Sequence, residues 1–252
     1  MKTTGNTILI TGGGSGIGRA LAEAFHALGN KVIISGRRKA VLDEVTAANP
    51  GMASLVMDAT DAEGIRTFAD ELVKTHPSLN TVINNAGIMK NEDIAAAPGY
   101  LDIAEETIAT NLLAPIRLTA ALLPHFLNQP QAAVLTVSSG LAFVPMVVTP
   151  TYSATKSAIH AYSVALREQL KDTPVEVIEI VPPYVQTTLQ GNHQATDERA
   201  MPLDAFISEV MDILTNRPDE KEVVVERCKP LRFAVQNGNF DKVFTMVNGM
   251  HG

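Results

Sequence analysis

The sequence is poor in cysteine, in tryptophan and in long apolar runs. Its 252 residues contain one cysteine, Cys228, and no tryptophan. A lone cysteine cannot form an internal disulfide, which favours a reducing compartment. The first residues lack the apolar core and cleavage site of a secretory signal, and no stretch approaches the roughly 18 apolar residues of a membrane span. We therefore expect a cytoplasmic protein with no membrane partner.

Long runs of like charge are also missing. The formal net charge is −7, and no basic tail is present, which argues against nucleic acid or an anionic membrane as partner. A hydrophobic content of 46% is that of an ordinary globular protein rather than a disordered one. Because no repeat, linker or shift in composition interrupts the chain, we predict a single domain over residues 1–252.

Apolar, β-branched runs alternate with helix-forming stretches along the whole chain. The runs are nearly continuous, which is typical of strands covered on both faces. This alternation predicts a doubly wound α/β fold with a mainly parallel sheet flanked by helices on both faces. The expected strands are 7–11, 31–35, 53–57, 81–85, 132–139, 175–183 and 222–226, and the expected helices are 16–28, 39–48, 61–76, 103–127, 152–171 and 202–216.

The longest polar irregular stretch, 183–200, follows the sixth strand at its carboxyl end. Open α/β sheets bind ligands at that end, and long irregular loops in compact domains are usually functional. We therefore interpret 183–217 as a substrate-binding loop and helix within the domain.

The strict dinucleotide fingerprint G-x-G-x-x-G is missing after the first strand. The chain has Gly12-x-x-x-Gly16-x-Gly18 instead, directly before a helix whose free amides and dipole favour an anion. Gly12 permits a sharp turn, Gly16 lets a phosphate approach the backbone, and Gly18 allows close packing of strand and helix. A tight turn without a ligand is the alternative interpretation of these glycines.

The end of the second strand lacks the acidic residue that binds the ribose of NAD. Gly36 stands at that position, and Arg37 and Arg38 follow it. Guanidinium groups pair with the 2′-phosphate of NADP, so the pattern favours NADP(H) over NAD(H). The alternative is that both arginines are solvated charges at the start of a helix.

Two residues of one helix, Tyr152 and Lys156, are four positions apart and therefore share a face. An ammonium near a phenol lowers the pKa of the phenol, and a tyrosine so tuned exchanges protons near neutral pH. A solvent-facing pair on an ordinary helix is the alternative.

Three further features surround this pair in the sequence. Ser139 ends the fifth strand, 13 residues before Tyr152, and the sequence NNAG at 84–87 ends the fourth strand. Asn111 lies four residues before Pro115, whose missing N–H leaves the carbonyl of Asn111 free to hold a water molecule. A plain kinked helix is the alternative for Asn111.

In this order and spacing, the motifs closely resemble those of the short-chain dehydrogenase/reductase family, over about residues 7–190. The resemblance implies a Rossmann-type sheet of about seven strands. It also implies hydride transfer between NAD(P) and a carbonyl or secondary alcohol. A redox sensor that binds NAD(P) without turnover is the alternative function.

The resemblance also assigns roles to individual residues. Tyr152 would be the general acid/base, Lys156 would hold the nicotinamide ribose and lower the phenol pKa, Ser139 would bind the reacting oxygen, and Asn111 would anchor a relay water. It implies a small-molecule substrate and a homodimer or homotetramer. The residues expected to contact the cofactor are Thr11, Gly12, Ser15, Gly16, Ile17, Gly18, Arg37, Arg38, Asp58, Ala59, Asn85, Ala86, Gly87, Tyr152, Lys156, Pro182, Val185 and Thr187.

The chain departs from the family after the sixth strand, where Pro182-Pro183 replaces the usual Pro-Gly. The apolar segment 141–148 is expected either to wall a hydrophobic substrate pocket or to form a core or subunit contact. His160 continues the face of Tyr152 and Lys156 and is expected to pack between elements. Cys228 has no histidine cluster around it, so we expect neither a metal nor thiol chemistry.

Overall fold

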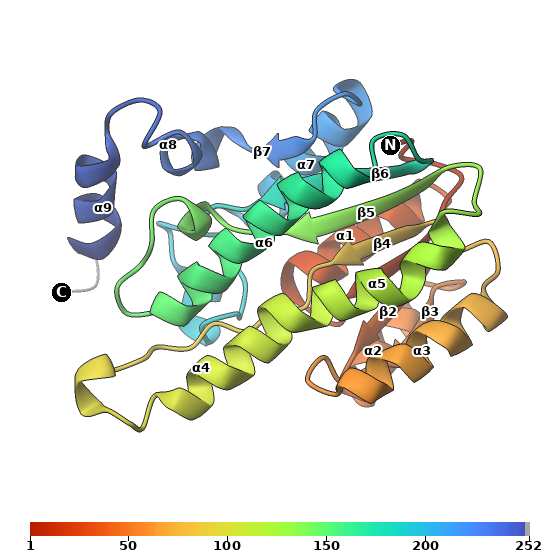
Figure 1. The fold of residues 1–252 in the computed structure, drawn as a ribbon, viewed down its shortest axis with the longest axis horizontal. Helices are drawn as coiled ribbons and strands as arrows, with labels where there is room; N and C mark the ends of the chain where they lie inside the picture. Colours follow the sequence, from red (N-terminus) through yellow and green to blue (C-terminus); the bar gives the residue numbers. More distant parts are fainter. Residues whose placement is uncertain (250–252) are drawn as a thin grey trace.

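The structure, a computed structural model, describes residues 1–249. Within these residues seven parallel strands form one sheet in the order β3-β2-β1-β4-β5-β6-β7 (Figure 1). The predicted doubly wound α/β fold with a sheet of about seven strands is thereby confirmed, while residues 250–252 of the predicted domain lie outside the described part. The strands are β1 (Thr7–Thr11), β2 (Lys31–Gly36), β3 (Ala53–Val56), β4 (Thr81–Asn84), β5 (Ala132–Val137), β6 (Val175–Val181) and β7 (Glu222–Val224).

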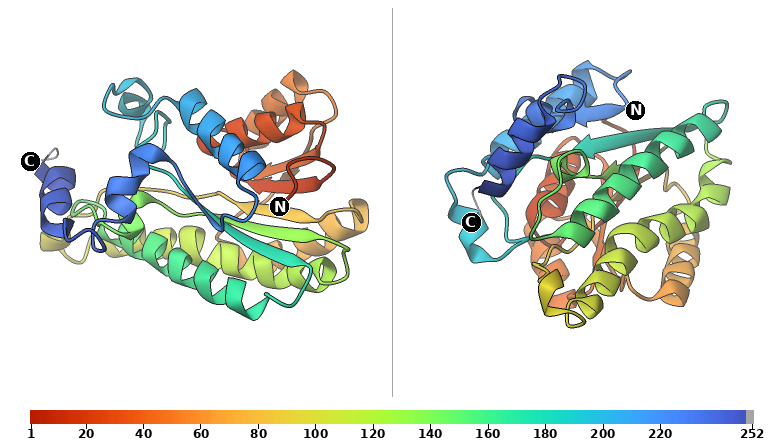
Figure 2. Two further views of the ribbon diagram at one scale, coloured as in Figure 1. Left: turned by 90° about the horizontal axis from the view of Figure 1, so that it is seen from above. Right: turned by 60° about the vertical axis from the view of Figure 1, so that its left-hand side comes forward.

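Helices cover both faces of this sheet (Figure 2). Along β1, Ile8 and Ile10 pack with α1 on one face, while Leu9 packs with α3 and α5 on the other. Because both faces are buried, the strand consists of a continuous apolar run. The helices are α1 (Gly16–Ala27), α2 (Lys39–Ala48), α3 (Ala62–Thr75), α4 (Leu101–Ile108), α5 (Ala114–Phe126), α6 (Pro150–Gln169), α7 (Leu203–Asn216), α8 (Lys229–Arg232) and α9 (Phe240–Gly249).

The single helix expected at 103–127 is divided by a wider turn. Residues Ala109–Leu113 between α4 and α5 wind as a π-helix, and the amide of Ala114 donates to the carbonyl of Ala109. Pro115 lacks the N–H that would continue the regular ladder, which explains the irregularity. Single π-turns of this kind are frequent at functional sites, and this one contains Asn111.

The continuous helical segment Leu101–Phe126, which consists of α4, the π-turn and α5, has the length and the apolar composition of a helix that could cross a membrane. The expectation that no stretch reaches that threshold is therefore wrong for this segment. In the structure 44% of its most apolar window is buried, α4 contacts α6, and α5 contacts α3. Its apolar residues thus contribute to the core beneath the sheet, as in a core helix of a globular fold.

Strand β6 ends at Val181, two residues before the predicted boundary, because Pro182 and Pro183 cannot donate ladder hydrogen bonds. The stretch that follows is more organised than its composition suggests. Val185 pairs with Met201, and the buried Gln194 donates from Nε2 to the carbonyl of Val185 at 2.7 Å. The chain then enters α7, so the predicted substrate loop is anchored at both ends.

Candidate active site

The predicted site residues follow the carboxyl ends of neighbouring strands. The strand order reverses between β1 and β4, and the crevice at such a switch point is where open α/β sheets bind ligands. The glycine turn follows β1, Asn85 follows β4, Ser139 follows β5 and Pro182 follows β6. Segments far apart in the sequence therefore meet at one edge of the sheet.

Thr11 connects the ends of β1 and β4. Its hydroxyl accepts hydrogen bonds from the amides of Asn85 and Ala86, each at 3.0 Å. The side chain of Asn85 donates in return to the carbonyl of Thr11 at 2.9 Å. These three bonds hold the predicted phosphate turn against the sequence NNAG.

The glycines of this turn are required by the conformation and by the packing. Gly12 has φ +68°, and a Cβ atom there would lie 2.9 Å from the Cα of Ala86. A Cβ at Gly18 would collide with the Asn85 amide and the Gly12 carbonyl. Gly16 has φ +54° but faces only Thr187, at 3.5 Å, so the backbone stays accessible at the predicted phosphate position.

The first turn of α1 supplies further groups for an anion. Ser15 precedes the helix, and its side chain makes no capping bond within residues 1–249. The amides of the first helical turn, which includes Ile17, are therefore free of a side-chain cap. Free amides and the positive end of the helix dipole fit a phosphate group.

At the end of β2, the two predicted arginines differ in their surroundings. Arg37 is exposed and its Nη1 lies 3.8 Å from Oε1 of Glu106 on α4. Glu106 also pairs with Lys90 at 2.6 Å. Arg38 is exposed and directly precedes α2. The sequence did not indicate Glu106 and Lys90, because they come from distant segments.

Asp58 lies after β3, next to the buried Ala59. Its carboxylate accepts from the amide and the hydroxyl of Thr60, each at 2.8 Å. These bonds lower the pKa of Asp58, with a smaller contribution from the charge of Arg37. An anion therefore persists beside Arg37 at neutral pH.

Tyr152 and Lys156 are both buried on the sheet-facing side of α6. The Lys156 ammonium donates to the carbonyl of Val137 at 2.8 Å and lies 5.5 Å from the centroid of the Tyr152 ring. Ser139 accepts from the amide of Leu141 at 3.1 Å. The neighbouring Ser138 instead donates to the carbonyl of Ile180 on β6, which supports Ser139 over Ser138 as the residue beside the phenol.

The pKa of the Tyr152 phenol differs in direction from the sequence-based expectation. Burial raises it to about 12, and the hydrogen bond with Ser139 opposes the rise. Burial lowers the pKa of Lys156 to about 8, and the charge of Glu179 opposes that change. Desolvation outweighs the ammonium because Lys156 donates to a main-chain carbonyl rather than to the phenol.

The side chain of Asn111 joins three segments. Its amide nitrogen donates to the carbonyl of Ile88 at 2.8 Å and to the hydroxyl of Thr155 at 3.4 Å. Its oxygen accepts from the amide of Ile88 at 2.9 Å. Gly87 approaches this oxygen so closely that a Cβ there would lie 3.3 Å away. Asn111 thus holds the segment after β4 against α6.

The residues after β6 do not all face the same space. The carbonyl of Pro182 accepts from the amide of Gly140 at 2.9 Å, which joins the β5 and β6 ends. Thr187 reaches the glycine turn at Gly16. Val185, however, is buried in the hydrophobic core with residues of α1 and α7. Its side chain therefore packs in the core and does not face the glycine turn.

An apolar cluster surrounds Tyr152, and the sequence indicated only part of it. The segment 141–148 contributes Val144 and Met146, and the C-terminal helix α9 contributes Val243 and Val247. Asn248 on α9 accepts from the amide of Val147 at 2.7 Å and donates to the carbonyl of Pro145 at 3.2 Å. The apolar spacing of residues 240–247 indicated a helix with one buried face. No feature of the neighbouring sequence indicated that this helix packs against Tyr152.

Comparisons with known proteins agree with this geometry. Residues 6–198 match the family described as short chain dehydrogenase. The chain is 39% identical over 251 residues to the uncharacterized oxidoreductase DltE of Bacillus subtilis (strain 168), covering 98% of each protein. It is 35% identical over 227 residues to an NADPH-dependent 1-acyldihydroxyacetone phosphate reductase of Schizosaccharomyces pombe, covering 87% of this chain and 74% of that protein.

The fold is also that of solved structures. A short chain dehydrogenase/reductase from Burkholderia phymatum, in complex with NAD, superposes with a TM-score of 0.80 over 96% of each chain at 17% sequence identity. At that identity the likeness concerns the fold alone. The relatives and neighbours thus include both an NADPH-dependent enzyme and an NAD complex.

Proposed function

This chain belongs to the short-chain dehydrogenase family, and we propose that it transfers a hydride between a nicotinamide cofactor and a carbonyl or secondary alcohol, with NADP(H) favoured over NAD(H). The observation that carries the proposal is the buried pair of Tyr152 and Lys156, whose ammonium lies 5.5 Å from the centroid of the Tyr152 ring, with Ser139 beside the phenol. The segment after β4 links these residues to the glycine turn through Thr11 and Asn111.

The residues around the glycine turn fit a dinucleotide. Gly12 and Gly16 keep the backbone open in conformations that side chains rarely adopt, and α1 directs uncapped amides toward the same place. A bound nicotinamide cofactor would supply or accept the hydride. Lys156 would donate to its ribose, and Thr187 would border its phosphates.

Tyr152 would give its proton to the substrate oxygen during reduction and take it back during oxidation. Its high pKa keeps the proton on the phenol in the free protein, so it is ready as an acid. Ser139 would donate to the same oxygen and hold it near the phenol. The nearby Lys156 ammonium would stabilise the phenolate that remains, since opposite charges attract strongly at a buried site.

The preference for NADP(H) depends on the end of β2. Because residue 36 is a glycine, no carboxylate stands there to repel a 2′-phosphate. The guanidinium groups of Arg37 and Arg38 are exposed nearby and can pair with that phosphate. The name of the Schizosaccharomyces pombe relative, an NADPH-dependent reductase, agrees with this preference. The carboxylates of Asp58 and Glu106 lie close to Arg37 and compete with a phosphate for its guanidinium group. Arg38 is therefore the better phosphate ligand of the two.

We propose that the carbonyl substrate is a small molecule with an apolar body. Hydrophobic residues from several segments of the chain pack around Tyr152, and an apolar wall selects an apolar ligand. The cover formed by α9 would contact that body. Members of the cluster are Met89, Leu141, Val144, Met146, Val148, Tyr152, Leu231, Ala234, Phe240, Val243, Phe244 and Val247.

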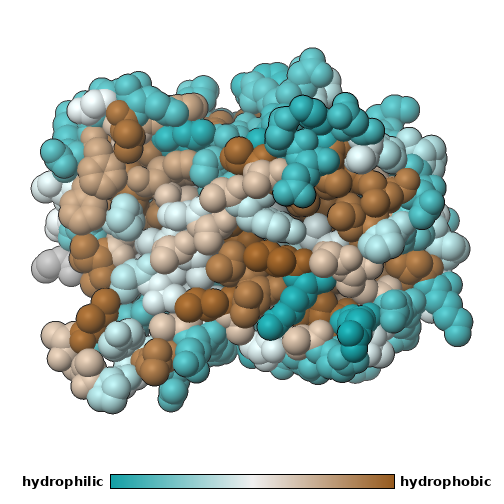
Figure 3. All heavy atoms as spheres, viewed as in Figure 1, coloured by the Kyte–Doolittle hydropathy of each residue, from teal (hydrophilic) through white to brown (hydrophobic). Residues whose placement is uncertain are grey.

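We further propose a cytoplasmic homodimer or homotetramer. Apolar atoms gather over the middle of the face that α5 and α6 cover (Figure 3). Three exposed apolar residues are Ile108 on α4, Leu113 in the π-helical turn and Val164 on α6. A second copy of the chain would bury them there. Analytical ultracentrifugation tests this assembly directly, and a monomer at micromolar concentration would contradict it.

The test of the proposed function starts from cofactor binding. NADPH and NADH are titrated separately, with the fluorescence of the bound reduced nicotinamide as the signal. A carbonyl panel is then assayed with the tighter cofactor. We expect turnover that falls by at least about 100-fold in Tyr152→Phe, with NADPH binding retained. Binding of NADPH without turnover on any carbonyl would favour the redox-sensor alternative, and near-normal turnover of Tyr152→Phe would contradict the role of Tyr152.

A further inference from the structure

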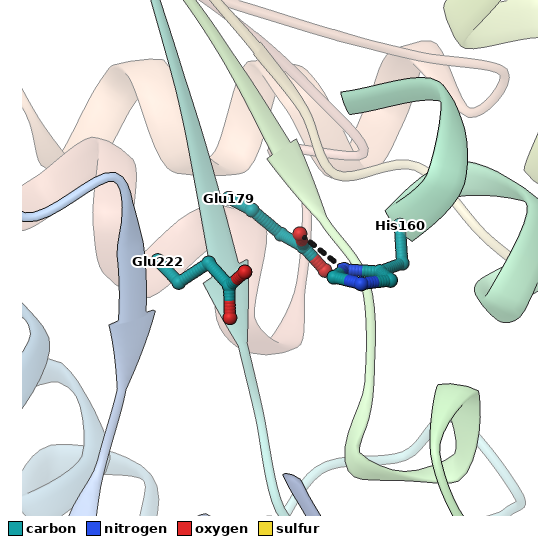
Figure 4. A group of neighbouring side chains, drawn as sticks. All are labelled: His160, Glu179 and Glu222. Carbon is teal, nitrogen blue, oxygen red and sulfur yellow. Dashed lines mark hydrogen bonds and ion pairs between the residues drawn. The ribbon is translucent and has the colours of Figure 1, made fainter. Parts of the chain in front are cut away.

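A fully buried carboxylate lies under the helix that carries Tyr152 and Lys156. Glu179 is in the middle of β6 with an exposure of 0%. Its Oε2 accepts from Nδ1 of His160 on α6 at 2.8 Å, as Figure 4 shows. Its Oε1 has no hydrogen-bond partner in the described part of the chain. Burying a carboxylate with one oxygen unpartnered is costly, so its presence calls for an explanation.

His160 connects this carboxylate to the proposed catalytic helix. It lies one helical turn after Lys156 and therefore on the same face of α6. Further along this face, Ser163 bonds the hydroxyl of Thr136 on β5 at 2.7 Å. Arg167 donates to the carbonyl of Val177 on β6 at 3.0 Å. The sheet-facing side of α6 is thus fastened to the sheet by a row of polar contacts.

The other charged groups around Glu179 come from β7 and α8. Glu222 pairs with Glu179 in the register of β6 and β7. Arg232 on α8 binds both oxygens of Glu222, at 2.6 and 3.1 Å. Cys228 is also nearby, but burial raises its pKa to about 12, so its thiol stays neutral.

A divalent cation is the obvious alternative occupant of this cluster. The donor atoms of His160, Glu179 and Glu222 all lie within 4.8 Å of one another. However, Glu222 is already occupied by Arg232, and three cations (Lys156, Arg167 and Arg232) face two carboxylates. A metal ion would add positive charge to a cluster in which cations already outnumber carboxylates.

We infer that Glu179 is a positioning residue of the proposed active site: its buried carboxylate, bonded to His160 one helical turn from Lys156, keeps the Lys156 ammonium in its charged form. The inference rests on the proposed function for its catalytic meaning. Its physical content concerns the charge of Lys156 alone and is measurable in the free protein.

The electrostatics of Lys156 support this role. Burial lowers the pKa of its ammonium to about 8, and the charge of Glu179 raises it. Without that charge the pKa of Lys156 would fall further. Below pH 7, removal of Glu179 would therefore make the buried ammonium more costly to the free energy of folding. This extra cost would vanish at a pH where Lys156 is neutral both in the parent and in the variant without Glu179. Loss of the hydrogen bond with His160 alone would have the same pH dependence with and without Lys156, so only a difference between these two backgrounds reports on the ammonium.

The experiment measures thermal unfolding at pH 7 and pH 9 in the parent, Glu179→Gln, Lys156→Met and the double variant. We expect the decrease in Tm caused by Glu179→Gln to be larger at pH 7 than at pH 9, by about 2–4 °C. In the Lys156→Met background the decrease should be equal at both pH values. An equal decrease at both pH values in the presence of Lys156 would overturn the inference.

Two control variants isolate the charge. Glu179→Asp retains the carboxylate, and Glu222→Gln removes the neighbouring one, so both should change Tm equally at pH 7 and pH 9. If the glutamine variant does not fold, Glu179→Met replaces it, because a packed apolar side chain avoids an unsatisfied amide. A rise in Tm with added Zn²⁺ or Mn²⁺ that depends on His160 would instead identify a metal site and overturn the inference.

A second readout separates this inference from the proposed function. If the protein reduces carbonyls, the alkaline decline of kcat/KM should begin about one pH unit lower in Glu179→Gln than in the parent. If the parent has no turnover but the unfolding data show the expected dependence on Lys156, the proposed function fails and the inference about Glu179 stands.

Discussion

Glu92 accepts two hydrogen bonds from Thr151, one from its amide at 3.1 Å and one from its hydroxyl at 2.6 Å. The amide of Glu92 also donates to the carbonyl of Val148 at 2.9 Å. These contacts join the chain after β4 to the first turn of α6, directly before Tyr152. A carboxylate at this place also complements the helix dipole.

Replacement of Glu92 tests this connection. Glu92→Ala would leave the half-buried amide and hydroxyl of Thr151 without their acceptor, at a cost of about 1–3 kcal/mol in the free energy of unfolding. We expect kcat to fall as well, because the orientation of Tyr152 depends on the same helical turn. Glu92→Gln keeps an acceptor and should lose less. Glu105→Ala, at an exposed position on α4, is the matched control. Equal stability of Glu92→Ala and Glu105→Ala would contradict the role of Glu92.

The cofactor preference should respond to one substitution at the end of β2. A side chain at Gly36 has room, since its Cβ would lie 3.7 Å from Leu42. Gly36→Asp would place a carboxylate where a 2′-phosphate is expected and would offer an acceptor to a ribose hydroxyl. We expect NADPH affinity to fall by at least about 10-fold, equivalent to about 1.4 kcal/mol, and NADH affinity to rise. Gly99→Asp adds the same charge elsewhere and should change neither titration.

The rate of reduction should decline as pH rises through about 8. The pKa of Lys156 in the folded protein, about 8, lies below its ordinary value of 10.5, so the ammonium is present below pH 8 and is lost above it. The neutral amine stabilises the developing phenolate less well. A kcat/KM profile between pH 6 and pH 10 measures this decline. Lys156→Arg, which stays charged, should lack it, and a parent profile that is flat to pH 10 would contradict the prediction.

The same depressed pKa makes a prediction for stability. Because the unfolded chain binds this proton more tightly than the folded protein, the free energy of unfolding should gain a favourable contribution between about pH 8 and pH 10.5. Lys156→Met removes that contribution. Comparison of the pH dependence of urea unfolding between the two proteins measures it.

Substrate selectivity should depend on the inner face of α9. Val243 is buried in the cluster around Tyr152, whereas Met246 on the same helix is 51% exposed. Val243→Asn should lower kcat/KM for ketones with a large apolar body more than for small ketones, by roughly 10-fold relative to the parent. Met246→Asn is the control and should leave the ratio unchanged. A uniform loss for all substrates in Val243→Asn would argue against a contact with the apolar body.

Most of the sheet and the spacing of the site residues could be predicted from the sequence. Strand β1 begins and ends at its predicted residues, because an apolar run between a polar start and a glycine turn is a local signal. The conformations of Gly12 and Gly16 follow from neighbouring residues in the same way. Tyr152 and Lys156 share a face of α6 because helical periodicity is local too.

Other properties depend on contacts between distant segments and could not be derived from the sequence. The pKa of Tyr152 is raised because α9 and Met89 bury the phenol. Arg37 forms an ion pair because α4 brings Glu106 next to it. The first turn of α6 is bonded by Glu92, which comes from the chain after β4. No periodic pattern indicates that Glu179 ends up fully buried beneath His160. The sequence alone determined the order of the strands and helices and the spacing of the motif residues, but neither the end of β6 nor the division of the helix at 103–127. The tertiary structure decided which charges are desolvated and which are paired, since burial and pairing depend on segments that meet only after folding.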